Sequence, residues 1–129
     1  MMDKTDNNIG TIKIANEVVA IIASLAATEI EGVAGMSGGV GSGIAEILGH
    51  KKGVKVEAGE EECVVDLSLI IDYGHSIPEI AEKVQKNVKE AIENMTGLNA
   101  VEINVHVQGV RFADGEEIEE VEGEEEEST

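Results

Sequence analysis

The chain has 129 residues and a net charge of −18, which is enough length for one domain with a hydrophobic core and too little for two. This acidity argues against sequence-independent binding to nucleic acid or to an anionic bilayer, because both require a basic surface. Tyr73 and Phe112 are the only aromatic residues. The core must therefore consist of Val, Ile, Leu and Ala, and the chain has no row of rings for stacking bases or sugars.

Residues 1–8 are polar and are expected to be flexible, and they lack the basic start and apolar run of a signal peptide. The longest nearly apolar run, residues 18–27, is much shorter than the roughly 20 residues that span a bilayer. The single cysteine, Cys63, cannot form an internal disulfide and is expected to be a buried thiol in a reducing compartment. These features predict a cytoplasmic protein without direct membrane insertion.

A short strand is predicted over residues 9–14, followed by a helix from about residue 15 to residue 30. The polar residues of this helix form one narrow stripe at 100° per residue, made of Glu17, Ser24, Thr28 and Glu31. A helix that is apolar nearly all round is buried on more than one side, either by its own domain or by another subunit. Val18, Ile21 and Leu25 are therefore candidate interaction residues.

The glycine-rich residues 32–43 are expected to form a short strand and then a flexible surface loop. They lack the Lys and Ser or Thr of a phosphate loop and the spacing of a dinucleotide-binding motif. The run Gly35-Met36-Ser37-Gly38 matches the loose G-x-x-G of KH domains, which clamp RNA or DNA. In that fold the loop joins two helices and usually brings basic residues, so a KH-like nucleic-acid-binding module stays as an alternative.

Two further strands are predicted at residues 54–58 and 63–71, joined by the turn at residues 59–62 into an antiparallel hairpin. Alternate residues of the second strand are apolar and are expected to face the core: Cys63, Val65, Leu67, Leu69 and Ile71.

A second helix is predicted over residues 76–96, with Ser76 at its cap, Glu79 three residues later and Gly97 at its end. Its apolar residues form one stripe: Ile77, Ile80, Ala81, Val84, Val88, Ala91, Ile92 and Met95. Its exposed face carries opposite charges four residues apart, including Lys89 and Glu93. The last strand alternates between inward Val101, Ile103, Val105 and Val107 and outward Glu102, Asn104, His106 and Gln108.

The order β-α-β-β-β-α-β predicts a small single α+β domain over residues 9–113. Its two helices are expected to pack on one face of a mostly antiparallel sheet, which leaves the other face to solvent or a partner. Residues 114–129 hold ten acidic residues and no base, so ten of the eighteen net negative charges lie there and eight remain for residues 1–113. Such a block repels itself and is predicted to be a disordered acidic tail.

No catalytic, cofactor or metal site is assigned from the sequence. The three histidines lack metal spacing, and no pair of nucleophile and base can be recognised. If the strand containing Cys63 is next to the last strand, Asp66 and Ser68 share a polar face with Asn104 and His106. This face is either solvated or a protein-contact surface. A ligand-binding or enzymatic site around His106 is a further alternative.

Several motifs follow one another in the chain: Gly10-Thr11-Ile12-Lys13-Ile14-Ala15-Asn16-Glu17-Val18, Glu31-Gly32-Val33-Ala34-Gly35-Met36, Gly43-Ile44-Ala45-Glu46, Gly53-Val54-Lys55-Val56, Asp72-Tyr73-Gly74-His75-Ser76-Ile77-Pro78-Glu79-Ile80-Ala81, Met95-Thr96-Gly97-Leu98 and Val101-Glu102-Ile103-Asn104-Val105-His106-Val107. In this order, over about residues 9–112, the sequence resembles the alkaline shock protein (Gls-type envelope stress response) family of Gram-positive bacteria.

The resemblance implies a non-enzymatic cytosolic protein linked to cell-envelope or general stress, and it brings no catalytic, cofactor or metal residues to carry over. Some members are held at the membrane by a separate membrane-embedded partner. We therefore expect a self-associating, partner-binding scaffold that forms a homo-oligomer and is recruited to the inner face of the cell membrane by such a partner. The long glutamate tail departs from the simplest family pattern, so its partners can differ.

Overall fold

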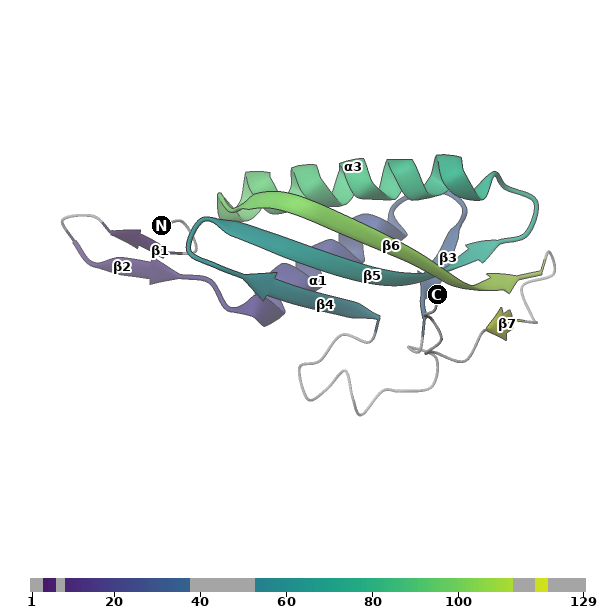
Figure 1. The fold of residues 1–129 in the computed structure, drawn as a ribbon, viewed down its shortest axis with the longest axis horizontal. Coiled ribbons are helices and arrows are strands. Elements are labelled where there is room, and N and C mark those ends of the chain that lie inside the picture. The colour runs from purple at the N-terminus through teal and green to yellow at the C-terminus, as the bar shows by residue number, and fades with distance from the viewer. Residues whose placement is uncertain (1–3, 7–8, 38–52, 113–117, 121–129) are drawn as a thin grey trace.

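The computed structural model describes residues 4–6, 9–37, 53–112 and 118–120, with only the backbone for 4–6 and 118–120. A five-stranded sheet is covered on one face by two helices, as predicted for an α+β domain (Figure 1). In chain order the elements are β1 (Lys4–Asp6), β2 (Thr11–Lys13), α1 (Asn16–Thr28), β3 (Val33–Met36), β4 (Val54–Ala58), β5 (Glu62–Asp72), α3 (Ile77–Thr96), β6 (Asn99–Arg111) and β7 (Ile118–Glu120).

The long strand β5 organises the sheet. β4 and β3 pair with it antiparallel, β4 along residues 63–67 and β3 along residues 69–71, so the predicted hairpin of residues 54–58 and 63–71 is confirmed. On its other edge, β6 pairs with β5 in parallel over residues 62–72. Parallel neighbours need a crossover connection, and α3 supplies it. Three of the four pairings in this sheet are antiparallel, although the longest is parallel.

Two short strands lie in segments that were predicted to lack regular structure. Lys4–Asp6 forms β1, which pairs with β2 in a separate two-stranded sheet, so residues 1–8 are not wholly irregular. Ile118–Glu120 forms β7, which pairs with Gly109–Arg111 of β6, within the segment predicted to be a disordered tail. In both places an available strand edge supplies backbone hydrogen bonds that no local composition signal reveals. The other residues of the tail lie outside the described part.

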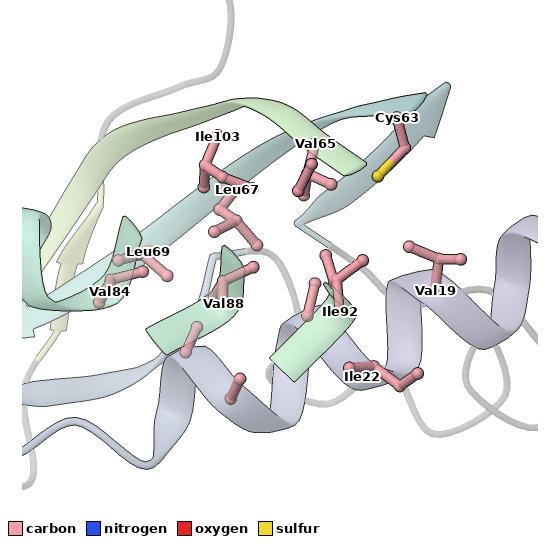
Figure 2. Packing of buried hydrophobic residues seen from close by; sticks show 14 of the residues in the cluster. Val19, Ile22, Cys63, Val65, Leu67, Leu69, Val84, Val88, Ile92 and Ile103 are labelled. Atoms are coloured by element: carbon pink, nitrogen blue, oxygen red, sulfur yellow. The ribbon is translucent and has the colours of Figure 1, made fainter. Parts of the chain in front are cut away.

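The core forms where β5 faces the two helices (Figure 2). The inward residues of β5 are fully buried, as predicted, and they meet Val84, Val88 and Ile92 of α3 and Val19 and Ile22 of α1. The α3 stripe is buried along its middle. Ile77 and Met95, which belong to the stripe in its first and last turns, are exposed.

A β-bulge near the start of β6 changes the predicted alternation. Ala100 pairs with Cys63 and Glu102 pairs with Val64, so Val101 is an extra residue in β6. The inserted residue turns away from the core, because a bulge locally reverses the two-residue period. Ala100 is consequently buried, and Val101 is exposed rather than inward.

The predicted ends of α3 are confirmed. Ser76 adopts an extended conformation, and its Oγ accepts a hydrogen bond from the backbone N–H of Glu79 at 3.4 Å. Gly97 has φ +81°, the left-handed conformation that glycine adopts without steric cost. The helix therefore begins and ends where its sequence signals lie.

Candidate interaction surfaces

The face of the sheet opposite the two helices carries a polar cluster, made of Asp66, Ser68, Asn104 and His106. The parallel register of β5 and β6 places Asp66 opposite Asn104 and Ser68 opposite His106. Asn104 Nδ2 donates a hydrogen bond to Asp66 Oδ1 at 2.8 Å, and His106 Nε2 lies 3.9 Å from the same oxygen. The structure thus brings together the four residues that the sequence placed on one face.

This polar cluster is open to solvent. The His106 side chain is about half-exposed, and Asp66 keeps more than a third of its side chain accessible. Lys55 of β4 is the Cα partner of Asp66 on the edge of β5 away from β6. Asp66 therefore lies between the strand that carries Lys55 and the strand that carries His106. Two shallow grooves of about 320 and 420 Å³ are lined by described residues, and neither includes the cluster. Its donors and acceptors therefore lie on an open surface, outside both grooves.

The second surface is an apolar stripe on α1, made of Val18, Ile21 and Leu25, which are 45%, 41% and 59% exposed. The opposite side of the helix packs against α3 and the sheet, and Asn87 of α3 donates a hydrogen bond to the Ala26 carbonyl at 2.8 Å. Because this packed side covers more than half of the circumference, it buries Ser24, which was predicted to lie on the polar stripe.

A third feature joins α3 to the edge of β6. Gln85 Nε2 donates to the Ile103 carbonyl at 2.9 Å and Lys89 Nζ donates to the Ala100 carbonyl at 3.0 Å, while the Ala100 N–H donates to Glu93 Oε2 at 3.0 Å. These side chains satisfy backbone groups that an edge strand would otherwise expose. From the sequence, Lys89 and Glu93 were predicted only to form a surface ion pair. In the sequence, Gln85, Lys89 and Glu93 follow one another at intervals of four residues, and this spacing could have shown that they share one face of the helix.

Two ionisable groups beside this edge have displaced pKa values. The Lys89 ammonium, 2.9 Å from Glu93 Oε2, and the Ala100 N–H hold the pKa of the Glu93 carboxyl below its ordinary value. Burial raises the pKa of the Cys63 thiol, and the nearby Glu93 carboxylate adds to this effect. Cys63 is thus a buried thiol held in its neutral form, and it offers no reactive nucleophile.

The far end of the sheet holds the chain's only arginine. Arg111 forms a two-pronged interaction with Asp72, with Nε 2.8 Å from Oδ1 and the second nitrogen 3.3 Å from Oδ2. The rings of Tyr73 and Phe112 lie next to it, with centroids 6.0 Å apart. This pairing ties the end of β5 to the end of β6.

The glycine segment does not have the geometry of a KH loop in the part that the structure describes. Gly35 and Met36 lie in β3 and pair with Ile70 and Leu69 of β5, whereas a KH loop joins two helices. Residues 38–52, which include the rest of the glycine-rich segment, lie outside the described part. Among residues 4–6, 9–37, 53–112 and 118–120, no group of three or more His, Cys, Asp or Glu side chains could hold a metal ion. Within those same ranges, no helix is long and apolar enough to cross a membrane.

Comparison with known proteins identifies relatives of this chain. The chain is 40% identical over 114 residues to YqhY of Bacillus subtilis, and this match covers 86% of this chain and 84% of YqhY. It is 37% identical over 107 residues to YloU of the same organism, covering 79% and 89% of the two chains. It is also 28% identical over 123 residues to a stress response regulator gls24 homolog of Streptococcus pyogenes, covering 92% and 69%.

Among solved structures, a variant of MamM-CTD superposes with a TM-score of 0.48 at 15% identity, over 75% of this chain and 99% of that one. The alkaline shock protein 23 family, described by a cell envelope-related function, matches residues 4–112. The chain therefore belongs to the alkaline shock protein 23 family, the family that its ordered motifs predicted.

Proposed function

We propose that this protein is a non-enzymatic scaffold of the envelope stress response, which self-associates through α1 and binds protein partners through the face of its sheet opposite the two helices. The observation that carries the proposal is the apolar stripe of Val18, Ile21 and Leu25 on a helix whose other side is already packed. Fully burying one such side chain contributes about 1.5–3 kcal/mol. Since each is roughly half-exposed, covering all three would contribute on the order of 3 kcal/mol.

Light scattering coupled to size-exclusion chromatography tests self-association. The wild-type chain should elute as an oligomer whose mass rises with concentration between about 1 and 100 μM. Leu25→Glu should shift it to the monomer, because a carboxylate placed in an apolar contact must lose its hydration. Met95→Glu is the matched control, since Met95 is also exposed and apolar but lies on α3. A monomeric wild type over the whole range would contradict the proposal.

Partner binding is assigned to the polar cluster of Asp66, Ser68, Asn104 and His106. Its support is an aligned set of donors and acceptors on a face that no helix of the described part covers. The α1 stripe belongs to the helical layer, so the two surfaces lie on different layers of the domain (Figure 1). One chain can thus contact its own copies through one surface and a different protein through the other, as a scaffold requires.

The same surface is proposed to recruit the protein to the inner face of the cell membrane through a membrane-embedded partner. Fractionation of the native cell tests this point. His106→Ala combined with Asn104→Ala should move the protein from the membrane fraction to the soluble fraction. His75→Ala is the matched control, because His75 is exposed on the loop before α3. Equal membrane fractions for the wild type and the double variant would exclude this surface as the recruitment site.

A further inference from the structure

Strands β1 and β2, called here the N-terminal hairpin, form a separate two-stranded sheet that projects from the body of the domain (Figure 1). Its strands contact each other and make few contacts with the other described elements. Ile12 is 55% exposed, while Ile14, two residues later, packs against the core. An isolated two-stranded hairpin is at best marginally stable in water. A hairpin with an exposed isoleucine would gain stability from an apolar surface to lie on.

The apolar stripe of α1 has the chemistry and the length to receive it. Val18 and Leu25 are seven residues apart, which is about 10 Å along a helix. Each strand of the hairpin has three residues and extends about 10 Å. The hairpin strands are therefore about as long as the stripe, and one hairpin laid along it can place Ile12 beside Ile21 and Leu25.

The hairpin cannot readily reach the stripe of its own chain. Only Ile14 and Ala15 lie between the end of β2 and the start of α1. Ile14 is anchored against the core, and Ala15 is extended, with φ −70° and ψ 149°. The hairpin consequently leaves the domain in the direction opposite to the course of α1 (Figure 1). Folding back would require the chain to reverse within these two residues and to pull Ile14 out of the core.

We propose that the N-terminal hairpin of one copy lies along the α1 stripe of a second copy, with Ile12 packed between Ile21 and Leu25 of that copy. The inference rests on the proposed self-association and specifies how it occurs. Each interface then joins two different surfaces, the hairpin of one copy and α1 of the next. This differs from a symmetric contact in which two α1 helices meet directly.

Disulfide trapping with two single variants of the full chain tests this arrangement. Ile12→Cys and Leu25→Cys carry different affinity tags, are mixed and are oxidised mildly. The native Cys63 is buried and does not compete. We expect the mixed disulfide to form at least about tenfold faster than either homodimer. A dominant Leu25→Cys homodimer would show direct packing of two α1 helices and overturn the inference. An intramolecular disulfide in the dilute double variant would overturn it as well, because the hairpin would then cover its own α1.

Light scattering separates this inference from the self-association itself. Ile12→Ser and Leu25→Ser should each weaken association about tenfold, and combining them should weaken it little further, because both remove one contact. Met95→Ser should leave association unchanged. If Leu25→Ser weakens association and Ile12→Ser does not, the hairpin inference fails while self-association stands. If the wild type is monomeric, both fail together.

Discussion

Gly32 provides a sharp test of how the connection between α1 and β3 packs. Its φ is +103°, and a Cβ built there would collide with Ile80 Cδ1. Gly74 is a matched control, since its φ is +104° and a Cβ there would meet nothing within 4 Å. An alanine at either position carries the backbone cost of a positive φ, about 1–2 kcal/mol. Gly32→Ala adds the cost of overpacking against the buried Ile80, about 1–3 kcal/mol.

We therefore expect Gly74→Ala to lower the free energy of unfolding by about 1–2 kcal/mol and Gly32→Ala to lower it by about 2–5 kcal/mol. Urea denaturation followed by circular dichroism measures both. All variants must be compared at one protomer concentration, because association would make the apparent stability depend on concentration.

The double variant identifies the atom responsible. Ile80→Val removes Cδ1, the atom with which the new Cβ collides. Alone, this change should cost about 0.5–1.5 kcal/mol. In the Gly32→Ala background it should cost nothing or restore stability, which gives a coupling of about 1 kcal/mol or more. Equal losses for the two glycine variants, or strictly additive losses in the double variant, would refute the packing argument.

Three further predictions concern single side chains. Folding lowers the pKa of Glu93, so the stability that the ionised carboxylate contributes is fully present above its ordinary pKa and is lost as the pH falls through the lowered pKa. In a profile of unfolding free energy against pH, Glu93→Gln should therefore flatten the decline below about pH 5. An unchanged decline in the variant would contradict this. Ser76→Ala removes the cap of α3 and should cost about 1 kcal/mol in urea denaturation, with a loss near zero as the opposing result. Cys63 is buried with a raised pKa, so a thiol reagent at pH 8 should label the folded protein far more slowly than the urea-unfolded chain, whereas equal rates would show an accessible thiolate.

The elements that could be predicted are those with a clear local period. Alternation along β5 and the stripe of α3 identify which side of each element is buried, because a strand repeats every two residues and a helix every 3.6. The polar cluster was predictable for the same reason, once β5 and β6 were assumed to be neighbours. What the sequence did not show was Val101 as a bulge, because inserting one residue depends on how two strands 38 residues apart are aligned.

For α1, the sequence pattern could not show which residues are exposed. Its sequence is apolar nearly all round, so its periodicity could not say which apolar residues the domain itself covers. Only the packing of α1 against α3 and the sheet leaves Val18, Ile21 and Leu25 outside and takes Ser24 inside. The hydrogen bonds that join Gln85, Lys89 and Glu93 to β6 were not predicted for a related reason. Their partners are backbone groups, which no residue type identifies.

By itself, the sequence determined the α+β class, the ends of α3, the inward residues of β5 and the family, since these depend on short-range periodicity, capping and the order of motifs. The tertiary structure decided the parallel pairing of β5 with β6, the exposed stripe of α1 and the projecting hairpin. These depend on the contacts between segments far apart in the chain. Local patterns show which side of an element is apolar, but only the assembled fold shows which apolar side chains remain exposed to water.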